Sequence, residues 1–271
     1  GSHVFTSRAY DAGVDDTGFG WGTVSPDINH DGWPDLIATG YSGQFAFLNQ
    51  TADSADISFE DVSLTLGIRG AGIDNGRGLA NFDYDNDGDQ DILVFQNNGP
   101  LKLYRNDLTG NGDTHWLRVF LDTNAAPDIA PNGIGSVVKV TTGGFTQVGR
   151  IDGGSNYLSQ SEMSAHFGLG TATVVDELRV EWTNGDVTIM NNVPADQTFT
   201  IAATSTPLLL GDLNCDGAVD FADAASFALA LTDASAYSTA YPTCNIDAAD
   251  LDGNSVIDGR DIAMFVQAIL N

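Results

Sequence analysis

Aspartate and asparagine recur at alternating positions in four short stretches of the chain, and this spacing restricts the local fold more than any other feature. The stretches are residues 27–35, 83–91, 212–223 and 250–261, named here the first, second, third and fourth loops. Short polar side chains around glycine favour tight turns and disfavour helix or strand interiors. Four loops of one type are therefore predicted.

The first two loops lie in an internal repeat. Residues 22–36 (GTVSPDINHDGWPDL) align with 78–92 (GLANFDYDNDGDQDI), and residues 5–14 align with 59–68. Each copy has a glycine-rich entry, a loop and an apolar strand-like run, and short strands with this period suggest blades of a β-propeller. Because about four blades are needed to close a propeller, the chain is expected to be the C-terminal part of a longer protein.

Residues 113–203 alternate between apolar and polar side chains, as strands do. Examples are residues 116–121 and 178–182, and the second run leads through Asn184 and Gly185 into another strand-like run. Asn-Gly is a strong signal for a two-residue hairpin. The pattern predicts an antiparallel β-sandwich-like domain.

The C-terminal region has helical spacing instead. Two apolar stripes are predicted to form the buried faces of two helices, one after each of the last two loops. They comprise Phe221, Ala224, Ala225, Ala228 and Leu231 in one stripe, and Ile262, Phe265, Val266, Ile269 and Leu270 in the other. The fold class is therefore mainly β with a small α C-terminal module. The predicted divisions are a tag remnant at 1–3, repeats at 4–112, a β domain at 113–203, a linker at 204–209 and paired loop-helix units at 210–271.

The spacing of the repeat loops suits a hard cation. Calcium takes about six to eight oxygen ligands, which a loop supplies from alternate carboxylates and a backbone carbonyl. A single loop of this kind could be a solvated turn, but two in register favour an ion. The predicted ligands are Asp27, Asn29, Asp31, Trp33 and Asp35, then Asp83, Asp85, Asp87, Asp89 and Asp91, with Trp33 and Asp89 acting through their carbonyls.

The third and fourth loops have the longer spacing of twelve-residue EF-type calcium loops. The predicted ligands are Asp212, Asn214, Asp216, Ala218, Asp220 and Asp223, then Asp250, Asp252, Asn254, Val256, Asp258 and Asp261, with Ala218 and Val256 acting through their carbonyls. Ser255 occupies a position where glycine is expected, so weaker binding or an altered turn is expected there. The total expectation is about four calcium ions.

Charge and cysteine content narrow the classes of partner and compartment. The chain has 37 acidic residues against 10 Lys and Arg, for a formal charge of −27, which argues against nucleic acid or anionic lipid as partners. No apolar run is long enough for a membrane span. Cys215 and Cys244 favour one disulfide, with two free buried thiols as the alternative.

The repeats resemble the FG-GAP/VCBS blades of integrin-type propellers, whose Asp-x-Asp-x-Asp-Gly-x-x-Asp loops bind calcium. The resemblance spans about residues 5–107, including the closing residues 103–106 (LYRN). It implies calcium-binding blades. Asn29 departs from the family pattern, which has aspartate there, and this removes a charge from the first loop.

The middle domain resembles the ASPIC/UnbV module found in relatives of cartilage acidic protein. The matching stretches are 115–117 (HWL), 133–135 (GIG), 153–161 (GGSNYLSQS), 166–170 (HFGLG) and 193–197 (VPADQ). The resemblance implies no settled activity. Tyr157, Gln160 and His166 either line a partner or glycan site or fix loops on the sandwich.

Residues 210–270 resemble the duplicated loop-helix units of type I dockerins, because position twelve is Asp in both loops and no entering helix precedes them. Dockerins bind cohesin modules through residues just before the last ligand of each loop. Those positions hold Phe221, Ala222, Gly259 and Arg260, unlike the Ser/Thr pairs of cellulosomal dockerins. The resemblance implies a cohesin-like protein partner.

Known enzyme signatures are not found in the sequence: there is no Gly-x-Ser-x-Gly elbow, phosphate loop or His/Cys metal cluster. A paired-carboxylate glycosidase stays open as an alternative, because the many Asp residues conceal any pair. We expect a secreted or cell-surface, calcium-binding, non-catalytic interaction or scaffold protein that binds a protein or glycan. The alternative is the C-terminal accessory region of a secreted polysaccharide-degrading enzyme.

Overall fold

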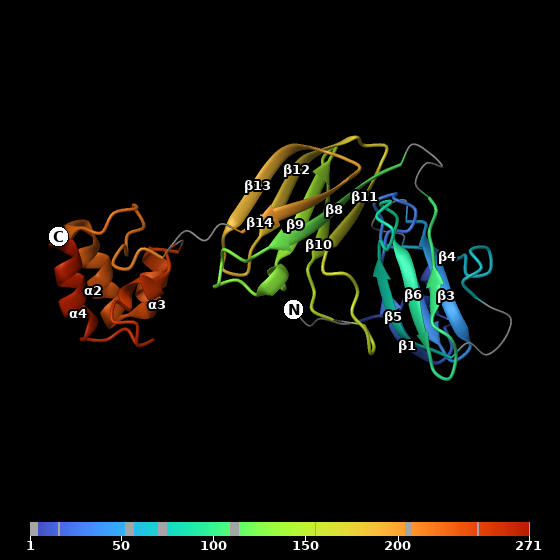
Figure 1. Cartoon of the computed structure of the whole chain (residues 1–271), viewed down its shortest axis with the longest axis horizontal. Coiled ribbons are helices and arrows are strands. Elements are labelled where there is room, and N and C mark those ends of the chain that lie inside the picture. The colour runs from blue at the N-terminus through green and yellow to red at the C-terminus, as the bar shows by residue number, and fades with distance from the viewer. Residues whose placement is uncertain are drawn as a thin grey trace. The chain divides into compact units, whose positions relative to one another are not determined.

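The computed structural model of the chain describes residues 5–15, 17–51, 57–69, 75–108, 114–154, 156–203, 208–242 and 244–270 (Figure 1). It is mainly β, with 34% of residues in strands and 16% in helices, so the predicted fold class is confirmed. The chain forms two compact units, residues 1–203 and 204–271. The predicted tag remnant and residues 204–207 of the predicted linker lie outside the described residues.

The two repeats form two small antiparallel sheets, and the start of the second copy, Phe59–Asp61, pairs with the first sheet. The first sheet follows the short helix α1 (Ala9–Ala12) and contains β1 (Gly20–Val24), β2 (Leu36–Gly40), β3 (Gly43–Asn49) and β4 (Phe59–Asp61), in that order. The second sheet contains β5 (Gly76–Phe82), β6 (Asp91–Gln96) and β7 (Lys102–Tyr104). The first loop connects β1 to β2, and the second loop connects β5 to β6.

The two repeat sheets pack against each other like neighbouring blades. Their shared core contains Ile37 from the first sheet and Leu79, Ile92 and Val94 from the second, all of them buried. Burying these apolar side chains removes their surface from water and holds the sheets together. The two loops therefore occupy equivalent positions on two packed blades.

The domain predicted at residues 113–203, called the β module from here on, is built from two stacked sheets. One contains β10 (Phe145–Arg150), β9 (Val137–Thr142), β12 (Val174–Glu181) and β13 (Val187–Pro194), and the other contains β11 (Ala165–Gly170), β8 (His115–Asp122) and β14 (Gln197–Ala202), each in spatial order. The predicted turn at Asn184 and Gly185 joins β12 to β13, with Gly185 at φ 95°. The core lies between the sheets.

One strand pair differs from the antiparallel prediction. β14 runs parallel to β8, from Gln197 opposite Leu117 to Ala202 opposite Asp122. The chain leaves β13 in one sheet and enters β14 in the other through a turn at Asp196, where φ is 58°. Because β13 and β14 belong to different sheets, the turn between them does not form a hairpin that would force β14 to run antiparallel to its neighbour. β14 can therefore pair with β8 in the parallel direction.

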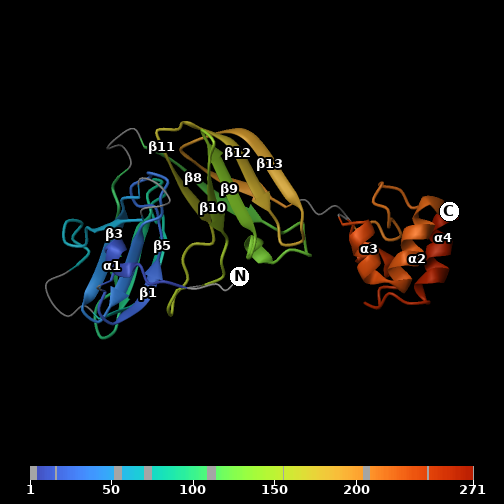
Figure 2. The same ribbon diagram turned by 180° about the vertical axis from the view of Figure 1, so that it is seen from behind.

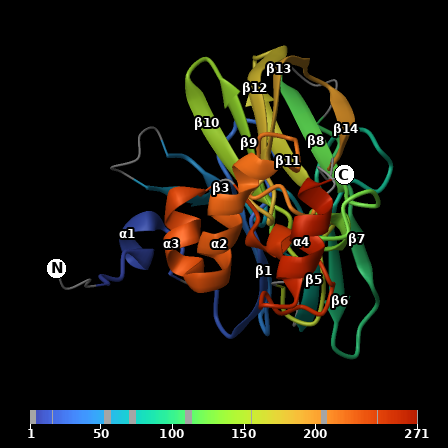
Figure 3. The ribbon, with the colours of Figure 1, turned by 90° about the vertical axis from the view of Figure 1, so that its left-hand side faces the viewer.

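The C-terminal unit contains three α-helices in the described residues. They are α2 (Ala224–Thr232), α3 (Ala234–Ala240) and α4 (Asp261–Ile269), with short 3₁₀ turns at Phe221–Asp223 and Ile246–Ala249. The third loop leads into α2 and the fourth into α4, as predicted. Figure 3 shows α2 and α4 beside each other, and the stacked rings of Phe227 and Phe265, 4.0 Å apart, join them.

The predicted buried stripes of the C-terminal helices were partly wrong. In α2 the buried apolar residues are Phe227 and Ala230, whereas Ala225 and Ala228 are exposed. In α4 Phe265 is buried, whereas Ile262 and Val266 are exposed, as are Phe221 and Leu270 elsewhere in the unit. Helix α3 was not predicted. It supplies the buried Tyr237, whose hydroxyl donates to the Leu213 carbonyl at 2.9 Å, so the core lies on a different face of α2.

Candidate metal-binding loops

All four loops share one hydrogen bond between an aspartate side chain and a backbone N–H group. The first aspartate of each loop accepts, through Oδ2, the backbone N–H of the residue five positions later. The pairs are Asp27 with Gly32 at 2.8 Å, Asp83 with Gly88 at 3.0 Å, Asp212 with Gly217 at 2.9 Å and Asp250 with Ser255 at 2.8 Å. The shared bond means that the two kinds of loop, although they sit in different folds, begin with the same turn.

The turn places its fourth and sixth residues in the left-handed region of backbone space. The fourth-position residues are His30, Asn86, Cys215 and Gly253, with φ between 59° and 71°. The sixth position is glycine in three loops and Ser255 in the fourth, where φ is 66°. The altered turn expected at Ser255 is therefore not found: serine adopts the same conformation at the cost of backbone strain.

The last carboxylate of each loop is held by backbone N–H groups. In the repeat loops, Asp35 accepts from Ile28 and Asn49, and Asp91 accepts from Tyr84 and Asn106. In the C-terminal loops, Asp223 and Asp261 each accept from three backbone N–H groups of their own loop. These bonds fix each last carboxylate opposite the start of its loop.

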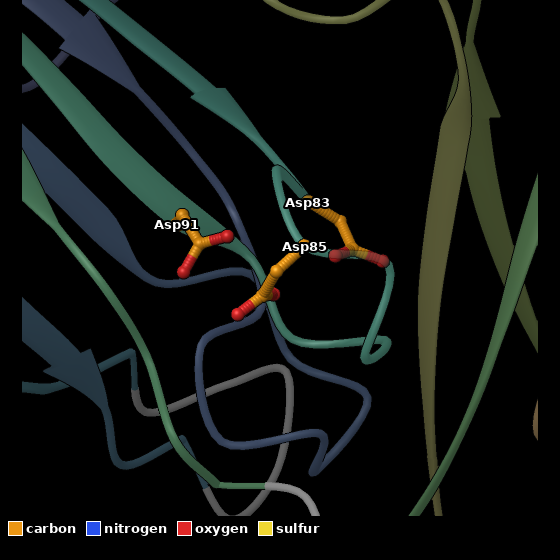
Figure 4. A group of neighbouring side chains, drawn as sticks. All are labelled: Asp83, Asp85 and Asp91. Carbon is orange, nitrogen blue, oxygen red and sulfur yellow. The ribbon is translucent and has the colours of Figure 1, made fainter.

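The carboxylates converge where the loops close. Atoms of Asp83, Asp85 and Asp91 lie within 4.8 Å of one another, and so do atoms of Asp250, Asp252 and Asp261. Figure 4 shows Asp83 and Asp85 on the loop and Asp91 at the start of β6. Carboxylates this close repel one another unless a cation or proton lies among them.

Burial makes that repulsion more severe in the repeat loops. Burial raises the pKa of Asp27 to about 7, with backbone N–H groups opposing the shift and neighbouring carboxylates adding to it. Burial also raises the pKa of Asp35 and of Asp91 to about 6. These carboxyl groups therefore hold their protons to a higher pH than an ordinary aspartate does, and a bound cation would favour their ionised form.

An unpaired oxygen points to the same chemistry in the third loop. Oδ1 of Asp212 is buried and has no hydrogen-bond partner among the described residues. A buried polar atom without a partner is costly, and a cation would satisfy it. The donor set is carboxylate, amide and carbonyl oxygen, which suits calcium or magnesium rather than softer metals.

The β module packs directly on both repeat loops. Arg118 of β8 lies 2.9 Å from Oδ2 of Asp83, and His166 Nε2 donates to the Gly88 carbonyl at 2.8 Å. A side chain at Gly168 would overlap the Asp27 carboxylate. The sequence patterns placed Arg118 and Gly168 in strand-like or family-matching stretches but assigned neither a role at the loops. The available signal was that Arg118 is one of only 10 basic residues in a strongly acidic chain.

Of the three residues considered for a partner or glycan site on the β module, His166 does not fit that role. His166 is bonded to the second loop, and burial lowers its pKa to about 3, so the ring is neutral. Tyr157 packs against Trp21 with ring centroids 5.2 Å apart, and Gln160 is exposed. Figure 2 shows the loop that carries Tyr157 and Gln160, between β10 and β11, beside β5. In this loop Ser159 and Ser161 accept the backbone N–H groups of Leu79 and Asn81 of β5.

The remaining predicted residues lie in the C-terminal unit. Cys215, at the fourth position of the third loop, is joined by a disulfide to Cys244. Phe221 and Ala222 lie in the 3₁₀ turn before α2, and Gly259 and Arg260 lie just before α4. All four are exposed, with Phe221 at 80%. They are accessible at the positions where the dockerin resemblance implies partner contacts.

Within the described residues, every helix is too short or too polar to cross a lipid bilayer.

Residues 27–94, which contain the first two loops, match the family model of the FG-GAP-like repeat. Residues 128–207 match the model named ASPIC and UnbV. No dockerin domain is detected. No curated protein matches the chain. The chain thus combines an FG-GAP-like repeat with an ASPIC/UnbV domain, which together indicate an interaction module of extracellular type.

Proposed function

We propose that the chain is a secreted, calcium-binding, non-catalytic interaction protein whose C-terminal unit tethers it to a partner. The observation that carries the proposal is the fourfold repetition of one hydrogen bond, from the first aspartate to the sixth-position N–H. In the second and fourth loops this bond lies beside converging carboxylates. Turn formation alone does not require this hydrogen bond, because ordinary β-turns reverse the chain without it. Its presence in separate parts of the chain therefore favours a shared ligand.

In each loop the protein's own groups have distinct roles. The alternate carboxylates would hold the ion, and the last one is oriented by backbone N–H groups before any ion enters. The seventh-position carbonyls, those of Trp33, Asp89, Ala218 and Val256, would complete the set. Calcium is favoured over magnesium because each loop offers more protein oxygens than the few that magnesium takes alongside its waters.

The C-terminal unit supplies the proposed tether. Its two loop-helix units carry the same three-fold N–H contact to the last carboxylate, at Asp223 and Asp261. Beside these carboxylates lie exposed Phe221 and Arg260. An exposed aromatic ring and an arginine are typical anchors of protein interfaces. A cohesin-like protein is therefore the proposed partner, with a glycan as the second possibility.

The secreted location rests on charge and redox chemistry. Extracellular calcium is abundant enough to load loops of moderate affinity. A disulfide such as Cys215–Cys244 persists in oxidising compartments. A net charge of −27 would be partly neutralised by bound calcium.

Calorimetric titration of calcium into the dialysed full chain tests the proposal, with metal analysis of the loaded protein as a second measure. Four ions per chain are expected. Asp83→Asn and Asp250→Asn variants should each lose one ion, whereas the matched variant Asp176→Asn, on the β module, should lose none. Binding of two or fewer ions by the wild-type chain contradicts the proposal.

The tether is tested separately, by capture from the secreted proteins of the source organism with the immobilised chain. Capture should require calcium and should be lost in the double variant Phe221→Ser/Arg260→Ser, while Phe145→Ser on the β module retains it. Equal capture by both variants would assign the contact to another surface.

A further inference from the structure

Arg118 reaches the second loop from a different domain. In β8 its neighbours Leu117 and Val119 are buried in the core of the β module, so strand alternation directs Arg118 to the opposite face of the sheet. There the guanidinium is almost fully enclosed, with the residue only 3% exposed. Its Nε donates to Thr198 Oγ1 of β14 at 3.1 Å, which fixes the orientation of the guanidinium group.

The guanidinium binds the second loop at three points. Nη1 lies 2.9 Å from Oδ2 of Asp83 and donates to the Asp83 carbonyl at 3.3 Å, and Nη2 donates to Oδ1 of Asn86 at 2.8 Å. Oδ2 also accepts the Gly88 N–H, whereas Oδ1 of Asp83 accepts, from the described residues, the Asp87 N–H alone, at 3.2 Å. Arg118 therefore occupies one oxygen of Asp83 and leaves the other facing the loop.

The two repeat loops differ by one side-chain carboxylate ligand, and Asp89, a predicted carbonyl ligand, adds a further carboxylate to the second loop. The second loop has Asp85 where the first has Asn29, so it carries four ligand carboxylates instead of three. Within the described residues, no Arg or Lys lies at ion-pair distance from a ligand carboxylate of the first loop. Arg118 brings a positive charge to the second loop, where Asp83 is closer to Nη1, at 2.9 Å, than its other acidic partner Glu162, at 3.7 Å. Arg105 also approaches Asp85, at 3.8 Å, but it is half-exposed and bonds Asp107 more closely.

We propose that Arg118 is a built-in counter-cation of the second loop, which keeps that loop folded against the β module before an ion enters. Calcium binding itself belongs to the proposed function; the counter-cation role concerns the metal-free loop and stands on the contacts of Arg118. A buried carboxylate that loses its only cationic partner is strongly disfavoured. The loss should therefore be largest when no metal supplies charge.

Hydrogen exchange of the full chain, followed by mass spectrometry of peptides covering residues 83–91, tests this role in EDTA and in calcium. In EDTA, Arg118→Met should raise exchange in these peptides at least tenfold over wild type. Arg118→Lys keeps the positive charge but loses the planar guanidinium with its several N–H donors, so it should give a smaller increase. Arg179→Met, a matched variant on the same module, should behave like wild type. Equal loosening of the loop in EDTA and calcium would overturn the counter-cation role.

A second variant separates charge from packing. Arg118→Met/Asp85→Asn gives the second loop as many side-chain carboxylate ligands as the first, since Asp85→Asn reproduces Asn29. Relative to Arg118→Met, this double variant should regain most of its exchange protection in EDTA, and Asp85→Asn alone should not loosen the loop. If Arg118→Met does not fold, folding of the double variant supports the proposal. Failure of the double variant to regain protection overturns it.

The outcomes distinguish the two proposals. If the double variant regains protection but calcium never protects the second loop of any variant, the counter-cation role holds and calcium binding at this loop fails. If calcium protects the wild-type loop but the double variant shows no recovery, calcium binding holds and Arg118 contributes packing only.

Discussion

His30 and Asp89 connect the two repeat loops through buried side chains: Nε2 of His30 lies 3.6 Å from Oδ1 of Asp89. His30 is the fourth residue of the first loop, and Asp89 supplies a predicted carbonyl ligand in the second. Burial lowers the pKa of His30, with Asp89 opposing the shift. A change in the conformation of either loop would therefore displace a residue of the other.

The C-terminal unit should depend on calcium for its fold. Each of its loops carries four ligand carboxylates that repel one another without a cation, and α2 and α4 contain only 9 residues each, which is too short for independent stability. In EDTA, peptides from residues 208–270 should exchange much faster, whereas peptides from the sheets of the β module should not. Persistent protection of α2 and α4 without calcium would contradict the expectation and remove the physical basis of the tether.

Reduction of the disulfide should destabilise the same unit. Cys215 and Cys244 are 29 residues apart, and closing a loop of this length contributes roughly 3–4 kcal/mol in the chain-entropy model. Thermal unfolding of the calcium-loaded chain, with and without reductant, measures the effect. The transition of unit 1, which has no disulfide among its described residues, serves as the internal control and should not move. Equal shifts in both transitions would indicate a general effect of the reductant.

Gly168→Ala should disturb the contact between the β module and the first loop. The added methyl group would overlap the Asp27 carboxylate and the His30 backbone, and overpacking of this kind costs about 1–3 kcal/mol. Chemical denaturation of the full chain should show the loss in unit 1. Gly153→Ala is a matched control, because its methyl group would make only ordinary contacts with Ile134. A wild-type midpoint for Gly168→Ala would mean that the interface can relax.

Ser255→Gly should stabilise the C-terminal unit. Serine at φ 66° is strained, and glycine would adopt this conformation with a gain of about 1 kcal/mol, less the entropy that glycine loses on folding. The bond from the backbone N–H to Asp250 would be kept. The melting temperature of the unit should rise, whereas Ser238→Gly, inside α3, should lower it. A fall in the melting temperature for Ser255→Gly would show that the serine side chain has a favourable contact in the turn.

Local patterns in the sequence were sufficient to predict several of the strands and all four loops. Alternation identified β8 and β12, and Asn184-Gly185 identified the hairpin after β12, because each of these signals depends on neighbouring residues. The ligand spacing likewise predicted which side chains share a loop. The turn at Ser255 shows the limit: the spacing was correct, but whether serine would accept a positive φ could not be read from the pattern.

Long-range relationships were not predictable in this way. The buried face of α2 includes Phe227 rather than Ala228 because α3, with its buried Tyr237, packs beside it. Nothing near Arg118 in the sequence indicates Asp83 as its partner. The direction of β14 depends on a crossing between sheets. Each of these features is set by contacts between segments that are distant in the chain.

The parallel pairing of β8 and β14 also has a mechanical consequence. β8 follows the repeats in the chain, and β14 is the last strand before the C-terminal unit. Because the two strands are parallel, a pull between the repeats and the C-terminal unit would act on opposite ends of the pair. Such a load would slide the strands past each other and strain all of their hydrogen bonds together, whereas antiparallel neighbours joined at one end would unzip one bond at a time. The ASPIC/UnbV domain would thus resist shear at the base of the proposed tether.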